Sequence, residues 1–343
     1  MKKIKILYLG NNLSQKSKYE TSISILTNLL IKEKIEVLVF SNKINKILRL
    51  SEMCLQLFKN RKHIDFLLVD TFSSSNFYYA YITTKIAKFL SIRYIPILRG
   101  GNLPERLDRS PRMSKGIFKY SFENIAPSGY LKYEFEKRSY STKLIPNVLD
   151  VSLYEFRRRT NIQPKLLYVR AFADIYNPLM AIRVLKELKK SYPNAQLCMI
   201  GPDRDGSFAG VKQLVSKLDL NDSVEFTGVL EKEKWHEKSK EYDIFINTTN
   251  FDNTPISVME VMALGIPVVS TNAGGLPYLL EDKIDALLVD KNDVIGMVDA
   301  ISQFLTSQVK VELLTKNARK KVEKFDWKYV KKDWNKLFKN EII

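Results

Sequence analysis

Short apolar segments alternate with amphipathic helical patterns along almost the whole chain, and this alternation limits the possible folds more than any other feature. In the first half these segments lie at residues 4–9, 37–40, 66–69 and 94–98. In the second half they recur at residues 166–169, 197–200, 224–226, 244–247, 267–270 and 286–289. Strands that are apolar on both faces and separated by helices form parallel sheets covered by helices. The sequence therefore predicts an α/β protein with two parallel sheets.

Chain length and one polar stretch predict a division into two domains. At 343 residues the chain exceeds the usual size of a single domain. The stretch RRRTNIQP at residues 157–164 interrupts the alternation and is typical of a linker. We therefore predict a Rossmann-like domain at residues 1–155, a second one at residues 164–325, and a final helix at about 326–343 that packs across both domains.

Positive charge is concentrated in the first half of the chain. The formal net charge is +17, and residues 1–150 hold 26 Lys and Arg against 12 Asp and Glu, whereas the remainder holds 29 against 26. Such an excess favours an anionic partner, either phospholipid headgroups or nucleic acid. A solvated, Lys-rich surface is the ordinary alternative.

Residues 43–58 combine an apolar row with basic residues. The apolar side chains fall mainly on one helical face, and they are Ile44, Ile47, Leu48, Cys54, Leu55 and Phe58. The basic residues are Lys43, Lys46, Arg49 and Lys59. The ordinary interpretation is a helix that packs this face on the core and leaves the other face wet. The alternative is a helix that contacts an acidic membrane surface.

The few cysteines and histidines exclude several kinds of site. Cys54 and Cys198 are too few and too far apart for a disulfide framework or a thiolate metal site, which agrees with a reducing compartment. His63 and His236 are equally isolated, which disfavours a zinc site or a Ser-His-Asp triad. No apolar run approaches the roughly 18 residues that cross a bilayer. We expect a cytoplasmic protein, with attachment to the inner face of the cell membrane as the alternative for its basic half.

The segment FDNTPISVMEVMALGIPVVSTNAGG at residues 251–275 carries the clearest signs of a ligand site. Asp252 precedes a predicted short helix and Glu260 lies within it, with Pro255 suited to the first helical turn. Unpaired helix amides at residues 253–257 would favour an anion such as a diphosphate. A buried strand follows at residues 266–270, and a glycine pair after it lets backbone approach a ligand closely.

Several of these features together resemble the family 4 glycosyltransferases. They are the two Rossmann-like halves, the run Ile145-Pro146-Asn147 followed by Asp150, and Glu260 within SVMEVMALGIPVVSTNAGG. The resemblance covers nearly the whole chain and is strongest at residues 252–275. It implies a GT-B fold, in which two Rossmann-like domains with parallel sheets face a central cleft and a C-terminal helix crosses between the domains.

The resemblance also implies roles for individual residues. The family pairs two glutamates with seven residues between them, and Asp252 with Glu260 keeps that spacing while shortening the first side chain by one methylene. Asp252 would approach the donor sugar, and Glu260 would accept hydrogen bonds from the ribose hydroxyls. The implied donor-binding residues also include Gly201, Gly228, Asn253, Thr254, Pro255, Ile256, Gly274 and Gly275.

One cation of the family pattern is present and another is missing. Arg170, after the first strand of the second domain, fits an arginine that binds the donor diphosphate. The family's neighbouring lysine has no counterpart between residues 171 and 178, where Ile175, Tyr176 and Asn177 stand instead. Electrostatic stabilisation is commonly the largest contribution to catalysis, so the missing lysine matters. Either another cation takes over its role at the diphosphate or the donor chemistry is unusual.

Two further loops are candidates for contacts with ligands. Arg99, Gly100, Gly101 and Asn102 follow a predicted strand and are candidate acceptor-binding residues, although a simple turn is an alternative. The sequence Asp203-Arg204-Asp205 is similar to the metal motif of the GT-A glycosyltransferases. Because it follows Gly201 at a strand end of the second domain, we favour a metal-independent reaction with no cofactor other than the nucleotide-sugar substrate.

The sequence as a whole predicts a retaining glycosyltransferase of the hexosyl type. We expect this enzyme to transfer a sugar from a nucleotide-sugar donor, a UDP-sugar, to a glycan or lipid-linked acceptor in bacterial surface polysaccharide biosynthesis. An anionic membrane surface is a further candidate partner, and no nucleic acid is expected. The alternatives are a nucleotide-sugar epimerase or phosphorylase on a related fold, and a catalytically impaired protein that binds a sugar nucleotide or nucleic acid.

Overall fold

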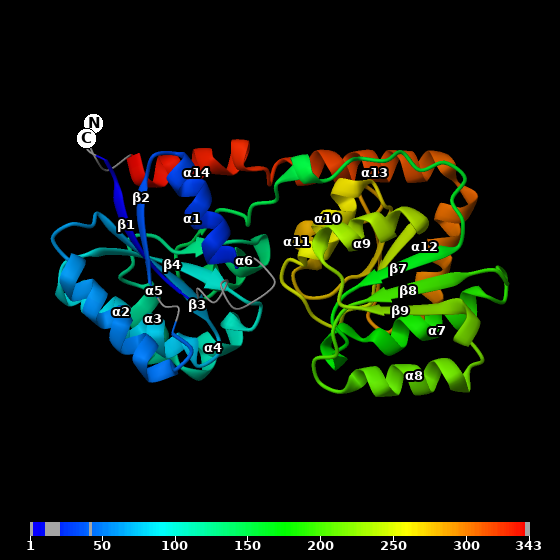
Figure 1. The fold of residues 1–343 in the computed structure, drawn as a ribbon, viewed down its shortest axis with the longest axis horizontal. Coiled ribbons are helices and arrows are strands. Elements are labelled where there is room, and N and C mark those ends of the chain that lie inside the picture. The colour runs from blue at the N-terminus through cyan, green and yellow to red at the C-terminus, as the bar shows by residue number, and fades with distance from the viewer. Residues whose placement is uncertain (1–2, 11–20, 41–42, 340–343) are drawn as a thin grey trace. The chain divides into compact units, whose positions relative to one another are not determined.

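The computed structural model describes residues 3–10, 21–40 and 43–339. The chain forms two compact units, each with its own hydrophobic cores (Figure 1). Unit 1 consists of residues 1–148 together with 327–343, and unit 2 consists of residues 149–326. In the part of the chain that the structure describes, no helix has both the length and the apolar character needed to span a bilayer.

Unit 1 is built on a parallel sheet whose strands lie in the order β2-β1-β3-β4-β5-β6. The strands are β1 (Lys5–Leu9), β2 (Glu36–Phe40), β3 (Phe66–Phe72), β4 (Arg93–Arg99), β5 (Ile125–Ala126) and β6 (Lys143–Leu144). The helices are α1 (Ser22–Lys32), α2 (Lys46–Asn60), α3 (Asn76–Phe89), α4 (Leu103–Arg109), α5 (Pro111–Phe118), α6 (Gly129–Glu136) and α14 (Trp327–Lys339). Consecutive strands need a crossover to run parallel, and the helices supply it.

Helices cover both faces of the unit 1 sheet because side chains alternate along each strand. Ile6 packs into the core shared with α1 and α14, whereas Leu7 packs into the core shared with α2 and α3. The C-terminal helix α14 is therefore part of unit 1. Phe338 packs on the ring of Phe66 at 5.4 Å between centroids, and the Trp327 indole donates a hydrogen bond of 3.1 Å to Glu33.

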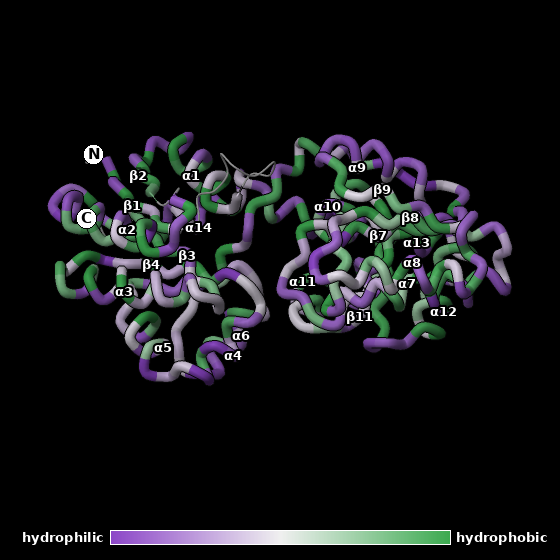
Figure 2. The backbone as a smooth tube through the Cα atoms, turned by 60° about the horizontal axis from the view of Figure 1, so that its bottom comes forward, coloured by the Kyte–Doolittle hydropathy of each residue, from purple (hydrophilic) through white to green (hydrophobic). Residues whose placement is uncertain are grey.

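Unit 2 has a second parallel sheet, in the order β12-β11-β10-β7-β8-β9. Its strands are β7 (Lys165–Val169), β8 (Gln196–Ile200), β9 (Val224–Gly228), β10 (Ile244–Asn247), β11 (Val268–Thr271) and β12 (Leu287–Val289). Its helices are α7 (Pro178–Leu188), α8 (Ser207–Lys217), α9 (Lys232–Lys238), α10 (Ile256–Leu264), α11 (Leu276–Leu279), α12 (Val294–Thr306) and α13 (Gln308–Glu323). Figure 2 shows mostly hydrophobic residues along β7 and β8, two central strands of this sheet. The predicted pair of parallel sheets is confirmed.

The strand order of unit 2 reverses direction between β7 and β10. From β7 the chain first builds outward through β8 and β9, and then returns to the other side of β7 to add β10, β11 and β12. The loops that leave β7 and β10 therefore begin side by side, at the carboxyl ends of two adjacent strands. In open α/β sheets, ligands bind outside the carboxyl ends of the strands at such a reversal.

The structure differs from the sequence prediction at the domain boundary. The change of unit falls between Val148 and Leu149, and the stretch 157–164 predicted as a linker is an internal part of unit 2. Its backbone pairs within that unit, since the amide of Arg157 donates to the carbonyl of Leu264 at 3.2 Å. Polar composition was misleading here because two arginines of this stretch, Arg157 and Arg159, donate to backbone carbonyls of the fold.

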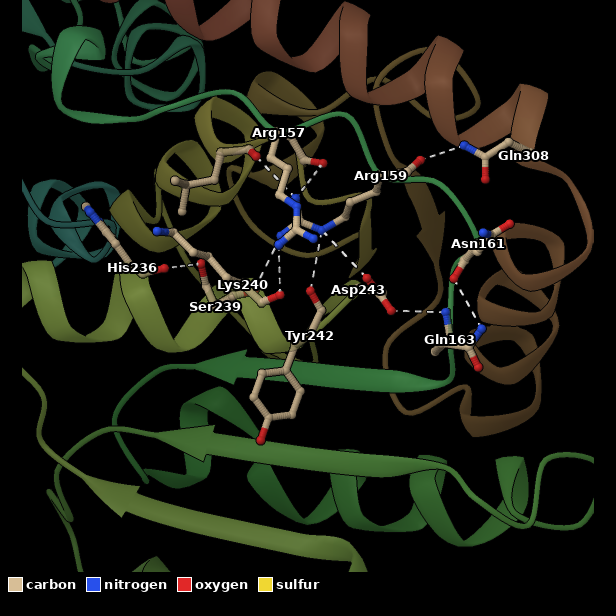
Figure 3. A network of polar contacts seen from close by, with 12 residues as sticks. Arg157, Arg159, Asn161, Gln163, His236, Ser239, Lys240, Tyr242, Asp243 and Gln308 are labelled. Carbon is tan, nitrogen blue, oxygen red and sulfur yellow. Dashed lines mark hydrogen bonds and ion pairs between the residues drawn. The ribbon is translucent and has the colours of Figure 1, made fainter.

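Arg159 is the centre of this internal network (Figure 3). Its side chain is 4% exposed, and Gln308 donates a hydrogen bond of 2.6 Å to its carbonyl oxygen. Burial lowers the pKa of the Arg159 guanidinium to about 10, which still leaves it charged at neutral pH. The guanidinium donates to four backbone carbonyls at 3.2 to 3.4 Å, those of Ser239, Tyr242, Leu264 and Gly265.

Candidate active site

The reversal point of the unit 2 sheet brings together two of the residues singled out in the sequence. Arg170 follows β7 and Asp252 lies in the loop after β10. A guanidinium nitrogen of Arg170 contacts the carboxylate of Asp252, and their side chains are 20% and 12% exposed. The second carboxylate oxygen of Asp252 accepts the backbone N–H of Asn253 at 2.8 Å. A charged pair is thus held at the position where this sheet topology binds ligands.

Tyr176, one of the three residues that stand where the family's lysine is expected, packs against Arg170. Its ring centroid lies 4.3 Å from the guanidinium carbon, a distance typical of a cation–π interaction. Burial lowers the pKa of Arg170, and the nearby positive charge of Arg204 lowers it further. Within the described part of the chain, the Nε atom of Arg170 is buried without a hydrogen-bond partner. Buried donors are normally satisfied, so this atom is a candidate contact for a ligand.

The loop after β7 is fixed to the loop after β10 by hydrogen bonds to its backbone. Thr248 donates to the carbonyl of Asn177 at 2.9 Å, and Thr249 donates to the carbonyl of Ile175 at 3.1 Å. These bonds hold the segment that carries Arg170 in one conformation. Such support keeps a charged group in place without reorganisation during a reaction.

The glycines predicted as donor-binding residues allow this close approach of loops. A Cβ atom on Gly201 would lie 2.0 Å from the carbonyl oxygen of Arg170, and one on Gly274 would lie 2.4 Å from that of Asp252. The amide of Gly275 donates to the same Asp252 carbonyl at 2.7 Å. Any side chain at these positions would displace the charged pair, so the glycines position Arg170 and Asp252.

Gly228 ends β9 on the other side of β8. It has a φ of +68°, a conformation that favours glycine, and its carbonyl oxygen accepts the amide of Gly201 at 2.9 Å. This bond joins the ends of β8 and β9. Gly228 itself is exposed. Its contact with a nucleotide base stays a prediction.

The helix after the Asp252 loop begins later than the sequence predicted. α10 starts at Ile256, and Pro255 precedes it as a residue of extended conformation without a side-chain cap. The amides left without intrahelical partners are therefore those of residues 256–258, whereas the amide of Asn253 is taken by Asp252. Thr254 and Pro255 complete the connecting loop. Because the free amides belong to a helix N-terminus, they favour an anion.

Glu260 lies on α10 in a polar pocket formed by two residues that the sequence did not reveal. Glu260 is 7% exposed and is the one charged residue of α10. The hydroxyl of Tyr154 donates to its carboxylate at 2.7 Å, and the ammonium group of Lys232 lies 3.4 Å from the same oxygen. Burial raises the pKa of Glu260, and the two partners oppose that rise. No local spacing links Tyr154 and Lys232 to Glu260, which is why sequence reasoning missed them.

His236 lies beside this pocket. Its ring centroid is 4.8 Å from that of Tyr154, and burial lowers the pKa of His236 to about 4. The imidazole is therefore neutral at physiological pH. Among the described residues, Lys232 is therefore the cation that lies next to Glu260. Its Nζ also lies 4.8 Å from the centroid of the Tyr154 ring.

In unit 1, the predicted acceptor residue Arg99 is part of a buried cluster. It is 8% exposed, and it donates to Asp70 at 2.8 Å, to Asn147 at 2.8 Å and to the Tyr8 hydroxyl at 3.2 Å. Tyr8, Asp70 and Arg99 come from β1, β3 and β4, the strands around the reversal of this sheet. The guanidinium is committed to these internal partners.

The remaining acceptor candidates form the loop between β4 and α4. Gly100 and Asn102 are exposed and Gly101 is half-buried. A Cβ atom on Gly100 would meet nothing within 4 Å, and its φ of +87° is a turn conformation. Their contact with an acceptor stays a prediction.

The sequence Asp203-Arg204-Asp205 forms a turn that begins α8. The carboxylate of Asp203 accepts the amide of Gly206 at 2.9 Å, and that of Asp205 accepts the amide of Asp174 at 2.9 Å. Both side chains thus serve the backbone, as Asp residues commonly do in turns. Within the described ranges, no three His, Cys, Asp or Glu residues are grouped as metal ligands would be.

Comparison with known proteins places the site of unit 2 in a family. Residues 155–321 match the family model of the glycosyl transferases group 1. The chain is 27% identical over 151 residues to the sulfoquinovosyl transferase SQD2 of Arabidopsis thaliana, covering 43% of this chain and 28% of that protein. It is 26% identical over 184 residues to the amylovoran biosynthesis glycosyltransferase AmsK of Erwinia amylovora, covering 48% and 45%. The alignments thus span less than half the length of these relatives.

A solved structure is similar over almost the full chain. HepE from Anabaena, in complex with UDP and glucose, matches with a TM-score of 0.76 at 14% identity, covering 98% of this chain and 100% of that one. At this identity the likeness shows the fold alone. The segment that carries Arg170, Asp252 and Glu260 therefore belongs to the glycosyl transferases group 1 family, on a chain with the GT-B fold.

Proposed function

We propose that this protein is a retaining glycosyltransferase that transfers a hexose from a UDP-sugar to a glycan or lipid-linked acceptor in surface polysaccharide synthesis. The observation that carries the proposal is the Arg170–Asp252 pair at the reversal point of the unit 2 sheet, within the family match. UDP is supported by the HepE complex with UDP and glucose. The pathway is supported by the similarity to an amylovoran biosynthesis glycosyltransferase.

The donor would use the charges and amides of unit 2. The amides of residues 256–258 suit the diphosphate, and Arg170 suits the negative charge that develops on it as the bond to the sugar breaks. Glu260 would accept hydrogen bonds from the ribose hydroxyls, with Tyr154 and Lys232 fixing its carboxylate. Asp252, which Arg170 holds, would face the sugar. The acceptor would bind unit 1, where the loop of Gly100–Asn102 is a candidate.

The proposed reaction exchanges one bond at the anomeric carbon. The acceptor hydroxyl attacks on the face from which the diphosphate departs, so the configuration is retained. The new bond joins the acceptor oxygen to the anomeric carbon, the bond to the diphosphate oxygen breaks, and the acceptor proton passes to the departing diphosphate. We propose that no metal is needed, because the carboxylates of Asp203 and Asp205 already accept backbone amides.

A catalytically impaired protein that binds sugar nucleotides is the second candidate. Ile175, Tyr176 and Asn177 stand where the family has its lysine, and none of the three carries a positive charge toward the diphosphate. Binding without turnover would favour this candidate over an active transferase.

Release of nucleoside diphosphate from a panel of UDP-, GDP- and ADP-sugars tests the proposed function. We expect release from a UDP-sugar by the wild type. For Glu260→Ala we expect a donor KM about 10- to 100-fold higher, because hydrogen bonds to a charged partner contribute about 1.5–3 kcal/mol. Glu281→Ala, which removes an exposed carboxylate of unit 2, should match the wild type. Equal KM values for Glu260→Ala and the wild type, or no release from any donor, would contradict the assignment.

A further inference from the structure

Helix α2 exposes a row of large apolar side chains. Ile47, Leu48 and Leu55 are 76%, 60% and 67% exposed. Ile44, just before the helix, and Phe58, in its last turn, are 65% and 42% exposed. Spacings of three and four residues place such side chains along one side of a helix. We call these five residues the α2 face.

This exposure reverses the ordinary interpretation of the sequence. The row of apolar residues was expected to pack on the core, but the core is contacted by the opposite side of the helix. Arg49, Met53 and Leu57 are buried there, at 5%, 2% and 0% exposure. α2 packs through them on the unit 1 sheet beside α3 (Figure 1). A surface helix normally turns polar residues outward, so an apolar outer row indicates a contact surface.

The charges around the α2 face are almost all positive. Five exposed basic residues lie before, within and just beyond α2, and they are Lys43, Lys46, Lys59, Arg61 and Lys62. The one acidic residue between positions 43 and 63 is Glu52, which is half-buried. Apolar side chains enter the acyl boundary of a bilayer, while lysine and arginine reach the headgroups and attract anionic lipids.

This charge pattern decides between candidate partners. Two copies of the chain that met through their α2 faces would bring ten cations together, and like charges oppose such a contact. A nucleic acid would satisfy the cations but would leave five large apolar side chains without apolar partners. We propose that the α2 face docks on a bilayer that contains anionic lipid, with the apolar row in the headgroup region. The proposal is independent of the proposed glycosyl transfer.

Sedimentation of the full-length protein with lipid vesicles tests the docking surface. We expect binding to vesicles of equimolar phosphatidylglycerol and phosphatidylcholine, and much weaker binding to phosphatidylcholine alone. Leu48→Asp with Leu55→Asp should lower the partition coefficient at least about tenfold, because it removes inserted apolar groups and adds negative charge. Val309→Asp, at a 79% exposed residue of α13 in unit 2, should leave it unchanged.

Further readouts separate docking from folding and from catalysis. The substituted side chains are exposed, so circular dichroism and the KM for a nucleotide sugar should equal those of the wild type. Lys46→Gln with Lys62→Gln should weaken binding to the anionic vesicles and shift its salt dependence. Equal vesicle binding by the wild type and the Leu48→Asp/Leu55→Asp variant would overturn the proposal. So would a wild-type dimer in sedimentation velocity that this variant abolishes, because the face would then be a protein interface.

Discussion

Arg170→Met is expected to lower the kcat of transfer by about 10²- to 10³-fold, the usual cost of losing one donor to a developing negative charge. The side chain is nearly enclosed, it is bound to Asp252, and it keeps one buried N–H group without a partner among the described residues. That arrangement is ready to contact a diphosphate without reorganising. Because no lysine stands between residues 171 and 178, Arg170 has less support from a second cation, so its loss should be severe.

Two variants make this result interpretable. Arg183→Met removes an exposed arginine of α7 in the same unit and should leave kcat unchanged. Arg170→Lys keeps a point charge but loses the guanidinium nitrogen that contacts Asp252, so its kcat should fall between those of Arg170→Met and the wild type. A kcat for Arg170→Met within about twofold of the wild type, a difference of about 0.4 kcal/mol in the barrier, would remove Arg170 from the chemistry.

Arg159→Leu is expected to destabilise unit 2 by about 3–5 kcal/mol, since it removes a buried guanidinium that donates to four backbone carbonyls and lies 4.0 Å from the carboxylate of Asp243. The guanidinium also holds the first residues of unit 2 against the end of α10 and the start of β10. Leucine is similar in volume to part of the arginine stem, but it offers no hydrogen bonds. We therefore expect the loss of stability to come mainly from the lost hydrogen bonds and less from lost packing.

Urea unfolding followed by fluorescence measures this effect. Because the chain has two units, the transition that belongs to unit 2 must be resolved before a free energy is assigned to it. Arg158→Leu is the matched control: its side chain is 69% exposed and pairs with Glu312 at the surface, so it should change the free energy of unfolding by less than about 1 kcal/mol. Equal midpoints for both variants would show that the Arg159 network is not a stabilising feature.

The fold and the centre of the site could be predicted because both follow from local patterns. Alternating apolar runs and helices leave few arrangements other than parallel sheets. Once β7 and β10 are adjacent, Arg170 and Asp252 must lie near each other, since each follows the carboxyl end of its strand. The glycine pair after β11 was also visible, although the structure shows it supporting the Asp252 loop.

Contacts between distant polar residues could not be predicted in this way. Tyr154 and Lys232 reach Glu260 from other elements, and no spacing in the sequence reports such a meeting. Arg159 resembles any solvated arginine until the carbonyls around it are known. For α2, apolar residues occur on both sides of the helix, so periodicity alone could not decide which side packs on the sheet.

A crystal structure of the protein with bound UDP is the most direct test of the central claim. The account predicts diphosphate oxygens within hydrogen-bonding distance of the amides of residues 256–258 and of the Arg170 guanidinium. It also predicts the ribose hydroxyls at the carboxylate of Glu260. UDP bound away from these groups, for example at the Tyr8–Asp70–Arg99 cluster of unit 1, would contradict the account.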